Sequence, residues 1–203
     1  MSVEIIDAEQ IEPEPWRNGG GTTRPLLTWP AASGRERERG WEVRISLAEI
    51  EADGPFSAFE GIERWFAVVS GAGVALEFDD SEHRLVAGDP PLRFDGGAAP
   101  ICRLLGGATR DINLMLRNGR GVLRSVVPGV AWSESFAMRG LFASVAGHWS
   151  DGGQRRAVPA MSLLWTEAET AGDESGWTFE PDDAGTTTVA WWLGFTPNTP
   201  VGR

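Results

Sequence analysis

The sequence predicts an all-β protein whose antiparallel strands form a sandwich or a barrel. Short apolar or alternating segments recur along the chain, with turn signals between them. The 203 residues include 26 glycines and 13 prolines, a composition that supports many tight turns. No segment shows helical periodicity over three turns, and strands do not alternate with helices, so a doubly wound nucleotide-binding fold is not expected.

The first half of the chain carries the clearest strand signals. Arg64–Val69 and Val74–Phe78 flank the turn Ser-Gly-Ala-Gly, and two aspartates with a serine then turn the chain again. The segments expected to form strands in this half are Trp41–Leu47, Arg64–Val69, Val74–Phe78, His83–Val86, Leu92–Phe94, Ile101–Leu105 and Ile112–Leu116.

The second half repeats this pattern less clearly, and Pro128–Gly129 marks a boundary near the end of the first strand set. Polar, glycine-rich composition predicts exposed loops at Gly147–Ala157 and Ala171–Gly176. Short helices are expected at Ser46–Ala52 and Met161–Thr170. The expected strands of this half are Val122–Val127, Leu141–Ala146, Ser162–Thr166 and Thr186–Phe195.

The net charge of −11 is concentrated in two segments of the chain. Residues 1–15 and 167–183 contain 12 of the 29 acidic residues and no arginine, which leaves 17 acids against 18 arginines elsewhere. Overall acidity argues against nucleic acid and an anionic membrane as partners. It does not argue against a small anionic molecule held by arginines in the balanced part.

Several reaction chemistries are excluded by residue types that the sequence lacks, and other features indicate the cellular compartment. Without lysine there is no Walker A loop and no Schiff-base chemistry, and without tyrosine no phenol acid or base. The single cysteine, Cys102, is expected to be a small buried hydrophobe in a protein of a reducing compartment. We expect a cytoplasmic protein, because no apolar run approaches roughly 18 residues and the acidic N-terminus does not resemble a signal peptide.

The segment from Trp16 to Arg24 is the most unusual stretch, because it contains three successive glycines. Glycines let a backbone approach a ligand or another strand closely, and Asn18 and Thr23 add hydrogen-bonding groups. A structural bulge or barrel corner explains the glycines equally well. The segment lacks the spacing and the flanking helix of a dinucleotide-binding loop.

Two further segments alternate cleanly between apolar and polar residues. In Trp41–Leu47 the apolar face holds Trp41, Val43, Ile45 and Leu47, and the other face holds Glu42, Arg44 and Ser46. In Arg110–Arg117 one face holds Ile112, Leu114 and Leu116, and the other holds Asp111, Asn113, Met115 and Arg117. Each polar face could line a pocket or simply meet water.

A loop with two aromatic residues, Phe56 and Phe59, spans Gly54–Arg64. Its aromatics could wall a pocket or pack as a cap on the core. The two histidines, His83 and His148, are far apart, and no ligand spacing typical of a metal site occurs, so we expect neither a metal nor another cofactor.

Four motifs occur in an order that resembles the HutD/Ves family of cupin-like proteins. They are Trp16-Arg17-Asn18-Gly19-Gly20-Gly21 with Thr23; Arg44-Ile45-Ser46; Gly54-Pro55-Phe56-Ser57-x-Phe59-x-Gly61-x-x-Arg64; and Asp111-x-Asn113-Leu114-Met115. The resemblance covers residues 16 to about 117, with a closing strand near Trp191–Phe195, and residues 118–186 add little. Glu60 and Glu63 stand where the family often has proline and aspartate.

This resemblance implies two double-stranded β-helix (cupin) barrels in one chain, without the usual metal-binding histidines. We assign residues 1–118 to a first barrel and 119–203 to a second, degenerate one, with the strand 186–196 a candidate to complete a shared sheet. The candidate ligand-binding residues that it implies are Trp16, Asn18, Thr23, Arg44, Ser46, Phe56, Arg64, Asp111 and Asn113.

The leading functional hypothesis is a non-enzymatic bicupin that senses or buffers a carboxylate-bearing metabolite. Since the resembled family is associated with histidine utilisation, urocanate or formiminoglutamate would suit. The alternative is a metal-independent cupin isomerase or hydrolase, in which Asp111 serves as general base. A third hypothesis is a tryptophan-rich interaction surface around Trp191–Trp192, used in a homodimer.

Overall fold

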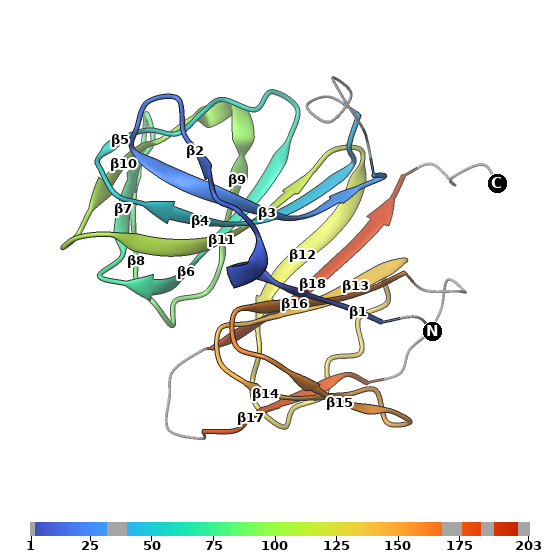
Figure 1. The fold of residues 1–203 in the computed structure, drawn as a ribbon. Helices are drawn as coiled ribbons and strands as arrows, with labels where there is room; N and C mark the ends of the chain where they lie inside the picture. Colours follow the sequence, from blue (N-terminus) through green and yellow to red (C-terminus); the bar gives the residue numbers. More distant parts are fainter. Residues whose placement is uncertain (1–2, 32–39, 168–175, 184–188, 199–203) are drawn as a thin grey trace. The chain divides into compact units, whose positions relative to one another are not determined.

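The computed structural model describes residues 3–31, 40–167, 176–183 and 189–198, and the fold is all-β as predicted (Figure 1). The only helical segments among these residues are single 3-10 turns, such as η1 (Ala8–Gln10) and η3 (Gly96–Ala98). Both expected α-helices are wrong. Ser46–Ile50 belongs to strand β4 (Val43–Ile50), and the described part of Met161–Thr170 is a turn residue followed by β16 (Ser162–Glu167). Local sequence was ambiguous there, and sheet pairing decided the outcome.

The chain divides into two compact units. The first unit is residues 11–117, and the second unit is residues 1–10 together with 118–203. The N-terminal strand β1 (Glu4–Asp7) pairs with β16, which is why residues 1–10 belong to the second unit although we expected them in the first.

Two antiparallel sheets make up the first unit. All strands expected in this part of the chain are present, with their ends shifted by a few residues. The larger sheet has the order β2 (Glu14–Pro15), β3 (Gly21–Trp29), β4, β11 (Thr109–Leu116), β6 (Glu63–Gly71), β9 (Leu92–Asp95). The smaller sheet has the order β5 (Gly54–Pro55), β10 (Ile101–Leu104), β7 (Val74–Glu77), β8 (Glu82–Leu85). Neither sheet closes on itself among the described strands.

The register of the larger sheet places polar side chains in rows across its central strands. Arg44 of β4 pairs with Met115 of β11, which pairs with Arg64 of β6. In the next row Ser46 pairs with Asn113. Because side chains alternate between faces along a strand, these residues share one face, as the alternation on β4 and β11 predicted.

An apolar cluster fills the interior of the first unit. Phe66 and Val68 of β6 belong to it, together with Leu76 and Cys102 of the smaller sheet, and all four are at most 2% exposed. The prediction that Cys102 is a small buried hydrophobe is confirmed.

The second unit also contains two antiparallel sheets. One has the order β1, β16, β13 (Met138–Ala143), β18 (Ala190–Pro197), β12 (Gly119–Ser125), and the other β15 (Arg155–Val158), β14 (Gly147–Ser150), β17 (Thr178–Pro181). The loop expected over Gly147–Ala157 is wrong, because β14 and β15 form a hairpin there. Trp149 and Val158 are buried, and their burial stabilises strands in a stretch of turn-like composition.

Two expectations fall partly outside the described residues. The loop Ala171–Gly176 is described only at Gly176, and the strand Thr186–Phe195 only from Val189 onward. The described part of that strand forms β18, which lies between β13 and β12 in the larger sheet of the second unit.

The tryptophan-rich surface expected around Trp191–Trp192 is absent, since these two side chains are 0% and 2% exposed. Trp192 stacks on Trp132 at a ring-centroid distance of 5.4 Å, and Trp191 lies 6.1 Å from Phe142. Trp192 therefore packs inside the second unit. Within the described parts of the chain, no helix is long and apolar enough to cross a membrane.

Candidate functional site

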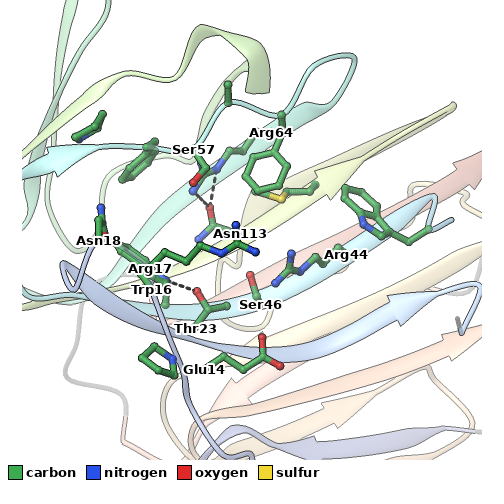
Figure 2. Close-up of a pocket in the computed structure, with 18 residues that line it drawn as sticks. Glu14, Trp16, Arg17, Asn18, Thr23, Arg44, Ser46, Ser57, Arg64 and Asn113 are labelled. Atoms are coloured by element: carbon green, nitrogen blue, oxygen red, sulfur yellow. Dashed lines mark hydrogen bonds between the residues drawn. The ribbon is translucent and has the colours of Figure 1, made fainter. Parts of the chain in front are cut away.

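A cavity of about 740 Å³ lies in the first unit, and its wall contains eight of the nine predicted ligand-binding residues (Figure 2). Contributions come from the β2–β3 hairpin, from β4, β6 and β11, and from the loop that follows β5. The eight residues are Trp16, Asn18, Thr23, Arg44, Ser46, Phe56, Arg64 and Asn113. The ninth, Asp111, does not line the cavity but contacts Asn113 from behind it.

Arg64 is a buried residue of the cavity wall and is fixed from several sides. Its Nε and Nη2 donate to Oδ1 of Asn113, at 2.8 and 2.6 Å. The guanidinium carbon lies 4.4 Å from the ring centre of Phe56 and 5.5 Å from that of Phe94. Burial lowers the pKa of Arg64 to about 10, against the opposing effect of Asp111, so the side chain stays charged at neutral pH.

Asp111 is a buried carboxyl group in which only one of the two oxygens accepts a hydrogen bond. Nδ2 of Asn113 donates to its Oδ1, whereas its Oδ2 has no hydrogen-bond partner. Burial raises the pKa of Asp111 to about 7, although nearby Arg64 and the bond from Asn113 both act to lower it. Asn113 therefore connects a permanent cation to a group that titrates near neutral pH.

Arg44 differs from Arg64 because it lacks a partner. It is half-buried in the cavity wall, and it makes no hydrogen bond or ion pair with any residue in the described part of the chain. Burial lowers the pKa of Arg44, and the charge of Glu14 partly compensates. A desolvated cation that makes no direct ion pair is costly, so this position favours an anion from outside the chain.

The glycine-rich hairpin owes its glycines to the backbone. A Cβ atom on Gly21 would lie 2.1 Å from the carbonyl oxygen of Glu49, so only glycine permits this approach of β3 to β4. Asn18 lines the cavity, and its Oδ1 also accepts from the amide nitrogen of Gly20 at 3.0 Å. Of the two explanations for the glycine run, close strand approach applies at Gly21.

Aromatic side chains form the apolar part of the wall. Phe56 is 8% exposed, so it both caps the core and borders the cavity. Trp16 is held by a 2.7 Å hydrogen bond from its Nε1 to Oγ1 of Thr23. Trp41 was expected on the other face of its strand from Arg44, yet both residues line the same cavity, and Trp41 packs with Met115. That expectation is wrong because β4 begins only at Val43 and a bend precedes it, which interrupts the alternation.

Sequence reasoning missed three further polar residues of the wall, namely Glu14, Arg17 and Ser57. Arg17 extends from the β2–β3 hairpin over the cavity (Figure 2). It lies inside the glycine-rich motif, so the motif pointed to its position but not to its orientation. Three arginines and one glutamate are the charged residues of the wall, which makes the cavity electropositive in an acidic protein.

No group of three or more histidine, cysteine, aspartate or glutamate side chains is arranged to hold a metal ion, as far as the described residues go. His83 packs edge-on against Phe78 in the first unit, and Nδ1 of His148 lies 3.2 Å from Oδ1 of Asp182 in the second. Burial raises the pKa of the Cys102 thiol to about 12, so this cysteine is not a thiolate ligand or nucleophile at neutral pH.

The fold of this chain is similar to that of solved all-β structures with little sequence identity to it. An oxalate decarboxylase mutant from Bacillus subtilis, 8% identical, superposes with a TM-score of 0.55 over 96% of this chain and 77% of that one. Its similarity extends to the fold alone. The fold and the site together define an all-β, cupin-like protein with an arginine-lined cavity of small-molecule size.

The chain belongs to the HutD family, because residues 8–175 match the model of that family. An uncharacterized 21.2 kDa protein in the hutC 3′ region of Pseudomonas putida is 35% identical over 56% of this chain and 57% of its own length. The match thus spans somewhat more than half of that relative. Protein Ves of Citrobacter koseri is 28% identical over 74% of this chain and 76% of its own length.

Two solved structures are similar over nearly the whole chain. A conserved protein of unknown function from Pseudomonas aeruginosa PAO1 is 26% identical, with a TM-score of 0.79 over 97% of this chain and 99% of that one. HutD from Pseudomonas fluorescens SBW25 is 24% identical, with a TM-score of 0.75 over 96% of this chain and 98% of that one. The resemblance seen in four sequence motifs therefore extends to both units.

Proposed function

We propose that this protein binds a small carboxylate-bearing metabolite in the cavity of the first unit and acts as a sensor or buffer of that metabolite. The observation that carries the proposal is Arg44, a half-buried cation on the cavity wall that makes no hydrogen bond or direct ion pair with the described residues and is only partly compensated by the charge of Glu14. An anion that enters the cavity would pair directly with Arg44 and offset part of the remaining desolvation cost.

Arg44 and Arg64 would hold the carboxylate from two sides. Arg64 uses two donors on Asn113, and a guanidinium has five, so others remain for a ligand. Asn113 is engaged by Arg64 and Asp111, which makes it a positioning residue more than a direct contact. Ser46 and Asn18 would read further polar groups of the ligand.

The apolar walls favour a ligand with a flat or partly apolar body. Trp16 and Trp41 border the cavity, as do Phe56 and Phe59. A relative of this chain is named for the hutC 3′ region, which supports an intermediate of histidine utilisation such as urocanate or formiminoglutamate as the ligand. Urocanate, with its planar conjugated body, would lie against the aromatic rings.

The two units would be two cupin-like modules of one bicupin, of which only the first carries this site. Each unit contains two antiparallel sheets, and the fold neighbours are cupin-like. The family motifs all lie within residues 11–117, the extent of the first unit.

Calorimetry with urocanate and with formiminoglutamate tests the proposal directly. A charge-assisted hydrogen bond contributes roughly 1.5–3 kcal/mol, so Arg44→Ala should weaken binding of the better ligand by about tenfold or more. Arg84→Ala is the matched control, because Arg84 is exposed on β8 and outside the cavity wall. Equal affinity of wild type and Arg44→Ala would remove the role given to this arginine.

The alternative is a metal-independent isomerase or hydrolase, and one observation favours it. Asp111 has a pKa of about 7, as a general base requires, but it does not line the cavity. Since Asn113 stands between Asp111 and the cavity, binding is the better proposal. Turnover of either metabolite by the wild type, and its loss in Asp111→Asn, would reverse this preference.

A further inference from the structure

The buried triad Arg64–Asn113–Asp111 suggests how the occupancy of the cavity is regulated. We propose that anion binding in the cavity is coupled to protonation of Asp111, so that the protein takes up one proton together with its ligand. This inference rests on the proposed function, because it requires a carboxylate beside Arg64. It goes further in making the affinity a function of pH.

The geometry makes Asp111 sensitive to what Arg64 contacts. Asp111 is 1% exposed and Arg64 is 8% exposed, so solvent screens their interaction poorly. Asn113 accepts from Arg64 through its Oδ1 and donates to Asp111 through its Nδ2, which fixes the orientation of the amide. A change of charge beside Arg64 therefore acts on Asp111 through the Asn113 amide, over a short distance from which water is excluded.

In the ligand-free protein the Asp111 carboxylate faces one cation. Among the described residues, Arg64 is the charged group that favours its ionised form, and Cys102 from β10 is a second titratable group near it. Cys102 remains a neutral thiol, since burial raises its pKa to about 12. Arg44 acts on Arg64 and Asp53 acts on Cys102, so these two charges affect Asp111 only indirectly. Glu14 acts on Arg44 and is one step further from Asp111 again.

A bound carboxylate would place a second negative charge beside Arg64. Two carboxylates would then interact with the same buried cation. Because the negative charge of the ligand disfavours a second negative charge nearby, the pKa of Asp111 would rise. Oδ2 of Asp111 can take the proton without loss of an existing bond, because Oδ1 alone accepts from Asn113. The proton comes from solvent, and the ligand keeps its own charge.

The sign of the effect follows from reciprocity between the two binding events. If the ligand favours protonated Asp111, then protonated Asp111 favours the ligand by the same factor. Affinity should be highest below the pKa of ligand-free Asp111, which is about 7. Above it, affinity should fall by up to about tenfold per pH unit, the limit for uptake of one proton.

The test uses formate, whose own carboxyl group does not titrate between about pH 6 and about pH 9. NMR of the wild-type protein follows the side-chain amide of Asn113 against pH, with and without saturating formate. Calorimetry measures the formate affinity and the number of protons taken up, from its dependence on buffer ionisation heat. Asp111→Asn removes the titrating group and keeps its shape, and Asp79→Asn removes an exposed carboxylate of a distant turn as control.

The expected result is a higher Asn113 titration midpoint with formate, uptake of up to one proton, and an affinity that weakens as pH rises. All three effects should vanish in Asp111→Asn and persist in Asp79→Asn. Formate binding with an unmoved midpoint and a flat affinity would overturn the linkage and leave the proposed function standing. If neither formate nor urocanate binds at any pH, the proposed function fails and the linkage falls with it.

Discussion

Arg64 in the first unit and Arg139 in the second are both buried arginines that lie against aromatic rings. Arg139 is 2% exposed, and its guanidinium lies 4.7 Å from the ring centre of Trp132 and 4.3 Å from that of Trp177. Its Nη2 donates to the backbone oxygen of Trp132 at 2.7 Å. Arg64 instead donates to the side chain of Asn113 and borders a cavity. A buried arginine thus packs within an aromatic core in the second unit and forms part of a polar cavity wall in the first.

Glycines show the same contrast between the units. In the first unit, a Cβ atom added to Gly21 or Gly73 would meet a backbone oxygen within 2.2 Å. In the second unit, a Cβ atom on Gly140 or Gly194 would meet an aromatic ring, that of Trp165 or Phe136, within 2.6 Å. At these two positions the second unit therefore uses a small residue to make room for a large ring.

The largest effect is expected from Trp177→Ala, which removes the centre of the aromatic core in the second unit. Trp177 is 0% exposed, and its ring lies within 6.3 Å of three other tryptophan rings. Loss of a fully buried tryptophan costs about 3–5 kcal/mol of unfolding free energy, measurable by chemical denaturation. Trp65→Ala is the control, because Trp65 is only half-buried in the first unit and should cost much less. Equal costs would contradict the central place of Trp177 in the aromatic core of the second unit.

Arg64→Met should cost about 3 kcal/mol of unfolding free energy at about pH 8, because it leaves Asp111 buried without a cation. The cost should shrink toward about pH 6, where Asp111 takes up a proton and its charge is lost. Urea unfolding at both pH values measures this difference. Arg93→Met, which removes an exposed arginine paired with Glu63, should change stability by no more than about 1 kcal/mol at either pH. A cost of Arg64→Met that does not vary with pH would exclude the coupling to Asp111.

The sequence predicted the strands of the first unit well, because alternation is a local property. On β4 and β11 the period of two showed which side chains share a face, and Ser46 and Asn113 do line the cavity. Alternation failed for Trp41, where a bend before Val43 interrupts the period. It could not separate strand from loop at Gly147–Ala157 either, since the stabilising burial of Trp149 and Val158 comes from distant segments.

The arrangement of the site depended on strand pairing, which is non-local. Arg44 and Arg64 belong to one row only because Met115 pairs with both. Family resemblance supplied the residues but not their roles, so Asp111 was expected in the cavity, whereas it lies behind Asn113. Arg17 could not be found by pattern, because nothing in a glycine-rich hairpin fixes the direction of its side chains.

Asp111→Asn should change how stability depends on pH. The pKa of Asp111 is raised from an ordinary 3.8 to about 7, so the folded protein holds a proton that the unfolded chain releases. Wild-type stability should therefore fall as pH rises through this range, by about 2 kcal/mol between about pH 5 and about pH 7. The difference between Asp111→Asn and wild type, measured by urea unfolding at each pH, isolates this contribution. A difference that stays constant with pH would mean that Asp111 does not titrate in this range.

The smallest effect on stability is expected at Arg44, although its effect on binding should be among the largest. Arg44 has no hydrogen bond or ion pair with described residues, and burial lowers its pKa, so its charge contributes no stabilising contact to the ligand-free fold. Arg44→Met keeps the apolar stem and should change the unfolding free energy by no more than about 0.5 kcal/mol, or raise it. The same variant should weaken carboxylate binding by about tenfold or more. Thermal unfolding with and without urocanate separates the effect on stability from the effect on binding. The ligand should stabilise the wild type and not Arg44→Met. A large loss of stability without ligand would mean that Arg44 supports the fold, as Arg139 does, and not a site.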